Sequence, residues 1–268
     1  MVTTARLWFT PPREIDRYLP EGPRVLPDTG NIIWVNIQTA PDAKAGSLHA
    51  RSGTSSAPPH PLPSRPGFVF PTDRPGVVFG TKDTAFDREA AVAHLYLYTV
   101  DDRRLSVLAG GMTCSNGKVF ADGGRTLFDI DTPRKVVTHY ELDIETRTPT
   151  ERGIALDLRH RADFPDGMVD AGDGTVIVAF YNPEYADAGR AERFRLHTGE
   201  VLDEWLTPGS PRVTCPLLFE EGGAVKLLLT TADEGMAPEL RAKCPNAGCL
   251  FVADTGLSAV PPAEVVRL

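Results

Sequence analysis

Three oxygen-bearing side chains occupy matching places in a repeated sequence pattern. Glu21, Asn116 and Asp166 each precede a glycine, and each stands eight or nine residues before the glycine of an acidic turn. Two carboxylates and one amide are hard oxygen donors, which suit Ca²⁺, Mg²⁺ or Mn²⁺. We therefore expect these residues to bind one divalent metal ion, with calcium favoured and magnesium, manganese or zinc as alternatives. Such a metal would keep open positions and could polarise a carbonyl, while Asp166 could act catalytically by moving a proton.

The same dipeptides also have a purely structural interpretation. Glu-Gly, Asn-Gly and Asp-Gly are ordinary turn formers in β proteins, and one of them alone would be read as a turn. Their agreement in position across three repeats, 95 and 50 residues apart, does not suit a local turn motif. The pattern therefore favours a shared site.

The elements that must position these residues are recurring hairpins. The five copies read LPDTGNIIWVNI, FPTDRPGVVFGT, FADGGRTLFDI, DAGDGTVIVAF and FEEGGAVKLLL. Their turn glycines are spaced by 46, 48, 50 and 49 residues and are Gly30, Gly76, Gly124, Gly174 and Gly223. A hairpin period near 50 residues is typical of a β-propeller with one blade per period. Positions of equal phase lie at equal depth around the channel, so the three donors should converge.

The period predicts an all-β fold, a β-propeller of five blades that spans residues 1–268 as one domain. A six-bladed propeller with one degenerate blade is the alternative, and whether residues 39–66 form a residual blade or a lid stays open. Within that stretch TSSAPPHPLPSRPG is Pro-rich, so it is expected to be a loop. The N-terminal strand ARLWF is expected to pair with the last blade and close the ring.

Composition narrows the classes of partner and location. The chain has 268 residues, 41% hydrophobic content and a formal net charge of −8, without a Lys/Arg-rich block. Nucleic acid and anionic membrane surfaces are therefore disfavoured, and a small-molecule substrate is expected. The start lacks a secretory signal and no apolar run approaches the ~18 residues of a membrane span, so a cytoplasmic location is expected. For Cys244 and Cys249 two free thiols are the default expectation, with a disulfide between them as the alternative.

Five further residues are candidates for contact with a substrate. Cys215 shares the phase of the proposed metal ligands, and Cys114 lies two residues before Asn116. Each cysteine has buried, inert packing as its alternative. The complete set of candidates is Arg65, Cys114, Tyr181, Asn182 and Cys215.

The motifs EGP, SNG and PDGM, in this order, resemble the family of regucalcin, gluconolactonase and luciferin-regenerating enzyme. They lie in PEGPRVLPDTGNIIWVNI, SNGKVFADGGRTLFDIDTPRKVVTHYELD and FPDGMVDAGDGTVIVAFYN, and DEGMAPELRAKCPNAGCLFVADTG closes the resemblance, which covers about 200 residues. The resemblance implies a propeller with one divalent metal at the channel mouth, held by Glu21, Asn116 and Asp166. It also implies hydrolysis of lactones, with Asp166 as the proton-transfer residue.

The chain departs from that family in two respects. Family members have six blades, about one more than the five turns found here. Their R-x-N-D-G motif, which contacts the sugar lactone, is replaced by Pro63-Ser64-Arg65-Pro66-Gly67. The metal ligands are therefore kept while the sugar-reading motif is lost.

These observations favour a metal-dependent hydrolase of lactonase type that acts on a lactone or ester other than a simple sugar lactone. One alternative is a metal-dependent cyclase, isomerase or dehydratase in natural-product biosynthesis. A second alternative, of another class, is a non-enzymatic scaffold that keeps the cation for stability.

Overall fold

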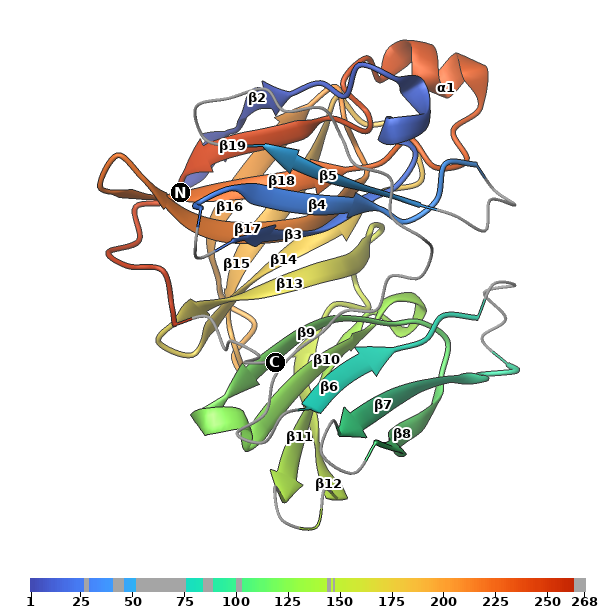
Figure 1. The fold of residues 1–268 in the computed structure, drawn as a ribbon, viewed down its shortest axis with the longest axis vertical. Coiled ribbons are helices and arrows are strands. Elements are labelled where there is room, and N and C mark those ends of the chain that lie inside the picture. The colour runs from blue at the N-terminus through green and yellow to red at the C-terminus, as the bar shows by residue number, and fades with distance from the viewer. Residues whose placement is uncertain are drawn as a thin grey trace.

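The computed structural model describes residues 1–26, 29–40, 46–51, 76–83, 89–99, 103–143, 146 and 148–262. Over these residues the chain forms five sheets, which follow one another as the blades of a β-propeller (Figure 1). Helical structure in the same residues is limited to α1 (Pro238–Lys243) and three short 3-10 turns. The expected all-β, five-bladed propeller is thus confirmed.

The fourth blade shows how the sequence builds these sheets. It is an antiparallel meander of β13 (Phe164–Gly172), β14 (Thr175–Tyr181), β15 (Ala188–Arg195) and β16 (Val201–Pro208). Strand β14, TVIVAFY, is buried on both faces up to its last residue, which explains its continuous apolar run. The turn between β13 and β14 places Asp173 and Gly174 at φ 52° and 68°, as a tight Asp-Gly hairpin turn requires.

Two more blades repeat this arrangement. The third contains β9 (Ser115–Ala121), β10 (Thr126–Asp131), β11 (Val136–Asp143) and β12 (Thr148–Asp157). The fifth contains β17 (Val213–Glu221), β18 (Ala224–Thr231) and β19 (Leu250–Asp254), with the N-terminal β2 (Arg6–Phe9) as its outermost strand.

The first two blades have three described strands each. The first contains β3 (Pro20–Val25), β4 (Ile32–Asn36) and β5 (Ser47–Arg51). The second contains β6 (Gly76–Gly80), β7 (Ala93–Thr99) and β8 (Arg104–Met112). The choice between a residual blade and a lid for residues 39–66 stays open; of these, 41–45 and 52–66 lie outside the described residues, and 47–51 belong to the first blade.

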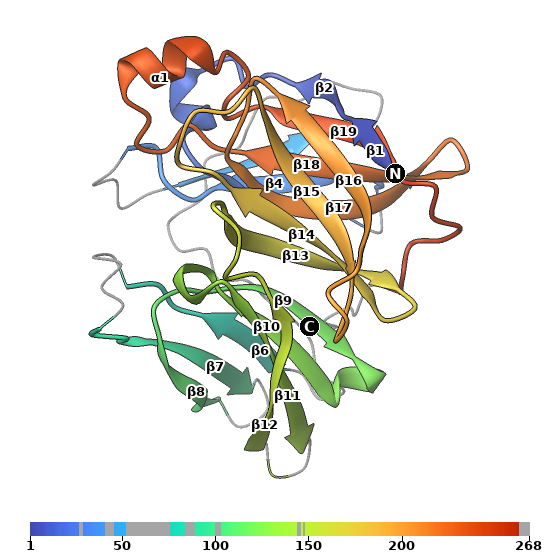
Figure 2. The same ribbon diagram turned by 180° about the vertical axis from the view of Figure 1, so that it is seen from behind.

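The N-terminus joins the ring at two places (Figure 2). Strand β2 pairs antiparallel with β19, as expected for ARLWF, so it covers the outer edge of the fifth blade. Strand β1 (Val2–Thr4) adds to β16 in parallel and extends the fourth blade. Residues at the start of the chain therefore tie the last two blades together.

Apolar clusters fill the spaces between neighbouring blades. One cluster joins the second and third blades around Leu95 and Leu127, and another joins the third and fourth around Ile130 and Phe180. Two further clusters join the fourth blade to the fifth and the fifth to the first. Neighbouring blades therefore pack against one another in succession, as in a propeller ring. In this arrangement the inner strands β3, β9, β13 and β17 lie toward the central channel.

Candidate functional site

The three predicted metal ligands lie on the inner strands of three blades. Glu21 is on β3, Asn116 on β9 and Asp166 on β13. Each strand has an irregularity in its pairing here, where two residues of the inner strand oppose one residue of its neighbour. Asn116 and Asp166 are the first residues of their bulges, whereas Glu21 pairs with Val35 directly before the bulge in its strand. A bulge of this kind changes the direction of a side chain.

The glycines that follow the ligands allow the inner strands to approach one another. A Cβ on Gly117 would lie 2.5 Å from the Met168 nitrogen and 2.7 Å from the Asp166 oxygen of the next blade. A Cβ on Gly167 would lie 2.6 Å from the backbone oxygen of Thr214 in the blade after that. The Asn-Gly and Asp-Gly pairs are therefore sites of close backbone contact between blades, in addition to their role as turn-like sequences.

The structure brings Asn116 and Asp166 into direct contact and places Glu21 beside them. The Asn116 Nδ2 donates a hydrogen bond to the Asp166 Oδ1, and also to the Thr132 Oγ1 at 3.2 Å. The Glu21 carboxylate accepts a hydrogen bond of 3.3 Å from the Gly22 amide. Glu21 and Asp166 are only 4% and 6% exposed.

Burial shifts the acidity of both carboxyl groups. Desolvation raises the pKa of Asp166 to about 7, although the Lys82 ammonium and the Asn116 hydrogen bond oppose the shift. The pKa of Glu21 also lies well above its usual value, because of burial first and the neighbouring Asp166 second. Two adjacent carboxyl groups therefore ionise together at a high free-energy cost when no cation lies between them.

These donors fit a hard divalent cation. Glu21 and Asp166 are two carboxyl groups buried side by side, and the attraction of the Lys82 ammonium for both does not offset the desolvation that raises their pKa. No group of three His, Cys, Asp or Glu side chains in the described ranges is close enough to hold a metal, so the third donor would have to be an amide. Rotation of the Asn116 amide would supply its oxygen.

The three residues border a cavity of about 860 Å³, a volume within the range of small-molecule sites. Glu21, Asn116 and Asp166 all line it. The rest of its wall combines apolar, hydroxyl-bearing and charged side chains, and it includes Leu19, Ile37, Thr81, Lys82, Cys114, Ser115, Thr132, Pro133, Phe164, Tyr181, Pro183, Arg212 and Glu234.

A set of charged residues in the cavity wall was not predicted from the sequence. The Lys82 Nζ lies 3.9 Å from the Glu234 Oε1. The Arg212 guanidinium donates to the backbone oxygens of Pro183, at 3.0 Å, and Glu234, and the Tyr181 hydroxyl donates to the same Glu234 oxygen at 3.3 Å. The loop that carries Glu234 is therefore held by two side chains from neighbouring elements.

The candidate substrate residues fall into different places. Cys114 and Tyr181 line the large cavity. Burial raises the pKa of Cys114 to about 12 and that of Tyr181 above its ordinary value, so both are protonated near pH 7. Asn182 is not among the lining residues of either cavity described here, and its Oδ1 accepts a hydrogen bond from the Glu184 amide in a turn. Arg65 lies outside the described residues.

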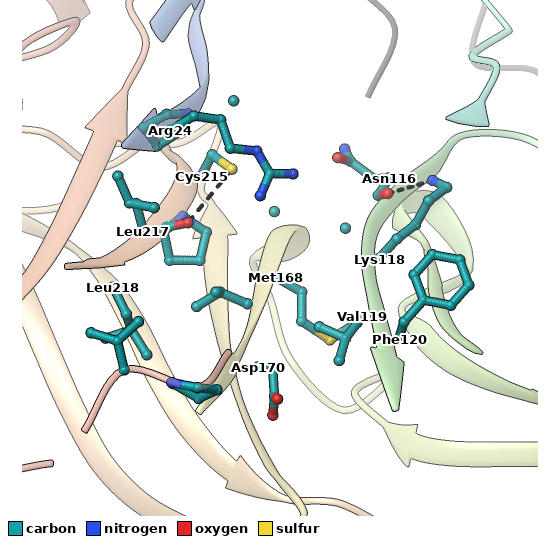
Figure 3. Close-up of a pocket in the computed structure, with 18 of the residues that line it drawn as sticks. Arg24, Asn116, Lys118, Val119, Phe120, Met168, Asp170, Cys215, Leu217 and Leu218 are labelled. Atoms are coloured by element: carbon teal, nitrogen blue, oxygen red, sulfur yellow. Dashed lines mark hydrogen bonds between the residues drawn. The ribbon is translucent and has the colours of Figure 1, made fainter. Parts of the chain in front are cut away.

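Cys215 lines a second, smaller cavity of about 150 Å³ (Figure 3). Arg24 and Cys215 face Asn116 and Lys118 across it, and Asn116 borders both cavities. Burial raises the pKa of the Cys215 thiol well above its ordinary value. Cys244 and Cys249 are free thiols in the structure.

The cavity residues that the sequence analysis missed also occupy matching positions in the repeat, different from those of the predicted ligands. Lys82, Tyr181 and Glu234 each lie on the last residue of the strand that follows a turn glycine or just beyond it, as do Ile37 and Thr132. Measured from the turn glycine of each repeat, these positions recur after six to eleven residues. The phase argument used for the first strand of each repeat would have found them on the second.

No helix in the described ranges has both the length and the apolar character needed to cross a membrane.

Comparison with known proteins finds curated relatives of part of the chain. Regucalcin of Danio rerio is 30% identical over 149 residues, which are 55% of this chain and 48% of the relative. The 6-deoxy-6-sulfogluconolactonase of Pseudomonas putida is 28% identical over 152 residues, 56% of this chain and 49% of the relative. The chain thus spans about half the length of these curated relatives.

A solved structure extends the likeness to the whole chain. The crystal structure of regucalcin from Agrobacterium tumefaciens, described as a calcium-binding protein, matches with a TM-score of 0.71 at 18% identity over 100% of this chain and 99% of that one. At this identity the match shows a common fold. The model of the SMP-30/Gluconolactonase/LRE-like region matches residues 73–233, more than half of the chain. The resemblance seen in the sequence is thereby confirmed, and the chain belongs to the SMP-30/Gluconolactonase/LRE-like family.

Proposed function

We propose that the protein is a metal-dependent hydrolase of lactonase type whose substrate is a lactone other than a simple sugar lactone. The observation that carries this proposal is the buried pair of Glu21 and Asp166, next to Asn116, in the wall of a cavity of about 860 Å³. The family and the lactonase among its relatives support the reaction class. The missing R-x-N-D-G motif supports a different substrate.

Glu21, Asn116 and Asp166 would hold the metal ion, and a bound divalent cation would supply Lewis-acid polarisation of the lactone carbonyl. Asp166 would exchange a proton with the attacking water or the leaving oxygen, because its carboxyl group lies at the metal site where the carbonyl would be polarised. In the metal-free protein Asn116 orients Asp166 through their hydrogen bond. Neither Cys114 nor Cys215 suits a nucleophile, since burial raises the pKa of both thiols.

Hydrolysis of a lactone panel in the presence of Ca²⁺, Mn²⁺ or Zn²⁺ tests the proposal, with acid release followed in a pH-stat. We expect turnover of at least one lactone that depends on the added ion, and a loss of about a hundredfold or more in Asp166→Asn. Asp173→Asn is the matched control, because Asp173 lies in the turn at the far end of the same hairpin with a positive φ that asparagine tolerates.

Activity on no lactone with any of these ions would reject the hydrolase. In that case metal-dependent conversion of a carbonyl compound without ring opening would favour the cyclase, isomerase or dehydratase. Metal binding that raises Tm without any turnover would favour the scaffold.

A further inference from the structure

Two histidines from neighbouring blades meet at the junction of the third and fourth blades. His139 lies on β11 of the third blade, and His197 lies in the turn between β15 and β16 of the fourth. Their ring centroids are 5.4 Å apart, and the ring planes are inclined by 60°. His197 is exposed and His139 is half-buried, so solvent and dissolved ions reach the pair.

The contact between the two blades holds both rings in place. The His197 amide donates a hydrogen bond of 2.9 Å to the Ala155 oxygen, which ties the turn of the fourth blade to β12 of the third. The buried Phe128 ring contacts both imidazoles, at centroid distances of 5.0 Å from His139 and 6.0 Å from His197. The partner of His139 on β12 is Gly153, which has no side chain to compete for the space beside the ring.

The imidazole nitrogens are available to a ligand. In the part of the chain that the structure describes, neither the His139 ring nor the His197 ring has a hydrogen-bond or ion-pair partner. Burial first, and the neighbouring His197 second, lower the pKa of His139, so its ring is neutral above pH 7. A neutral imidazole has one unprotonated nitrogen, and this is the form that binds a metal ion.

The charged groups nearby are engaged with other partners. Glu141 forms an ion pair with Arg152, and the Asp122 carboxyl group accepts a hydrogen bond of 2.8 Å from the Thr126 hydroxyl. Among the described ranges no group of three His, Cys, Asp or Glu side chains is close enough to hold a metal ion. An ion bound at this junction would therefore have two imidazole ligands, with water in its other positions.

The separation of the rings suits two ligands of one ion. In a tetrahedral site with zinc–nitrogen bonds of about 2.0–2.1 Å, the centroids of two bound imidazoles lie about 5 Å apart. The 5.4 Å between His139 and His197 is close to this value, so rotation of the side chains would direct one nitrogen of each ring at a shared ion. Imidazole nitrogen suits Zn²⁺ and Cu²⁺, whereas the oxygen donors Glu21, Asn116 and Asp166 suit harder ions. The two places in the molecule therefore favour different metals.

We propose that His139 and His197 together bind one divalent transition-metal ion, Zn²⁺ or Cu²⁺, and that this ion links the third blade to the fourth. The histidine site is separate from the oxygen donors in the channel and does not depend on the proposed lactonase function. Because the ion would join side chains of two blades that are together only in the folded protein, its binding would stabilise the fold.

Titration of the full chain with Cu²⁺ at pH 7.5, in excess Ca²⁺, tests this proposal. We expect calorimetry to show a Cu²⁺ site and the EPR spectrum to show coupling to two imidazole nitrogens, which the oxygen donors of the channel cannot supply. His139→Gln and His197→Asn should each weaken the site by about tenfold or more, because each leaves a single imidazole. Asparagine tolerates the φ of 64° at position 197. His160→Gln is the matched control, since His160 is exposed and has no ring contact with another histidine in the described residues.

Thermal unfolding in the same calcium buffer measures the link between the blades. Excess Zn²⁺ should raise Tm of the wild type and of His160→Gln, and should leave Tm of the other two variants almost unchanged. Equal Cu²⁺ affinity in all four proteins, a spectrum with a single coupled nitrogen, or weaker binding in only one of the two pair variants would overturn the shared site. An equal rise of Tm in all four proteins would assign the stabilising ion to another place and overturn the link.

Discussion

The side-chain amide of Asn116 donates a hydrogen bond to the carboxyl group of Asp166, across 50 residues of chain and between two neighbouring blades. This contact presents the amide nitrogen, not the oxygen, to Asp166. A cation shared by both residues requires the opposite orientation, because only the amide oxygen is a ligand. Asn116 therefore has two roles that exclude each other: it orients a metal-free Asp166, or it rotates and binds the ion beside it.

The pH dependence of stability should expose the cost of burying Asp166. Its pKa in the folded protein, about 7, is above the ordinary 3.8, so between these values the folded state holds a proton that the unfolded state has lost. The contribution of Asp166 to the free energy of unfolding is therefore largest at low pH and decreases as pH rises toward 7. In metal-free protein, wild type should therefore lose at least about 1 kcal/mol relative to Asp166→Asn between pH 5 and 7.5 in urea titrations.

Calcium should remove this difference, because an ion bound to the ionised carboxylates stabilises the folded state that carries them. A parallel pH dependence of the two proteins in the absence of metal would contradict a raised pKa at Asp166.

Replacement of Glu21 by glutamine should separate stability from metal binding. The change removes one of two adjacent buried carboxyl groups, so the metal-free protein should melt at a higher temperature at pH 8. The same change takes one negative charge from the site, and Ca²⁺ should bind at least about tenfold more weakly by calorimetry. Glu220→Gln, on the exposed part of β17, is the control and should change neither quantity. Unchanged calcium affinity in Glu21→Gln would remove Glu21 from the ligand set.

The sequence predicted most of the fold because each blade repeats the same local signals. The hairpin glycines and the apolar second strands, such as TVIVAFY, are short-range features, and their period alone gives the number of blades. The N-terminal strand was also predictable, since an apolar strand without a partner of its own must cover an edge.

The candidate site was less predictable, for a physical reason. The phase of Asn116 and Asp166 indicated that they would be neighbours, but not that the amide of one would bond the carboxyl of the other. Lys82 and Glu234 meet only through the relative placement of the second and fifth blades, which no local sequence signal encodes. Asn182 shows the opposite error: the residue follows Tyr181 directly, yet its side chain stabilises a turn instead of lining the cavity.

The close approach of inner strands at Gly167 gives a direct test of how the blades set the site. In Gly167→Ala the new Cβ would lie 2.6 Å from the Thr214 oxygen and 2.8 Å from the Cys215 Cα, both backbone atoms that have little room to move. We expect a loss of about 1–3 kcal/mol in the free energy of unfolding, together with weaker calcium binding, because Asp166 is the preceding residue.

Gly174→Asn serves as the control for Gly167→Ala. Gly174 has φ +68° with no atom within 4 Å of its would-be Cβ, and asparagine tolerates this conformation, so the cost should stay below about 1 kcal/mol. Equal losses in the two variants would show that the blade contact at Gly167 has no special role.

The buried ion pair of Lys118 and Asp129 connects the stability of the third blade to the site. The two side chains are fully buried, their charged atoms lie 2.9 Å apart, and the Lys118 Nζ also donates to the Asn116 backbone oxygen at 2.5 Å. Lys118→Met would leave the Asp129 carboxylate without its cation, at a cost of about 3–5 kcal/mol in urea unfolding at pH 7. The cost should shrink as pH falls, because burial already raises the pKa of Asp129 and protonation removes the lone charge.

A second variant distinguishes the charge from the contact with Asn116. Lys118→Met combined with Asp129→Asn removes both charges, so most of the lost stability should return, while Asn116 still lacks the hydrogen bond to its backbone oxygen. If that bond positions Asn116, calcium should bind more weakly in the double variant although its unfolding free energy is close to that of wild type. Calcium affinity that recovers together with stability would instead show that Lys118 acts on the blade alone.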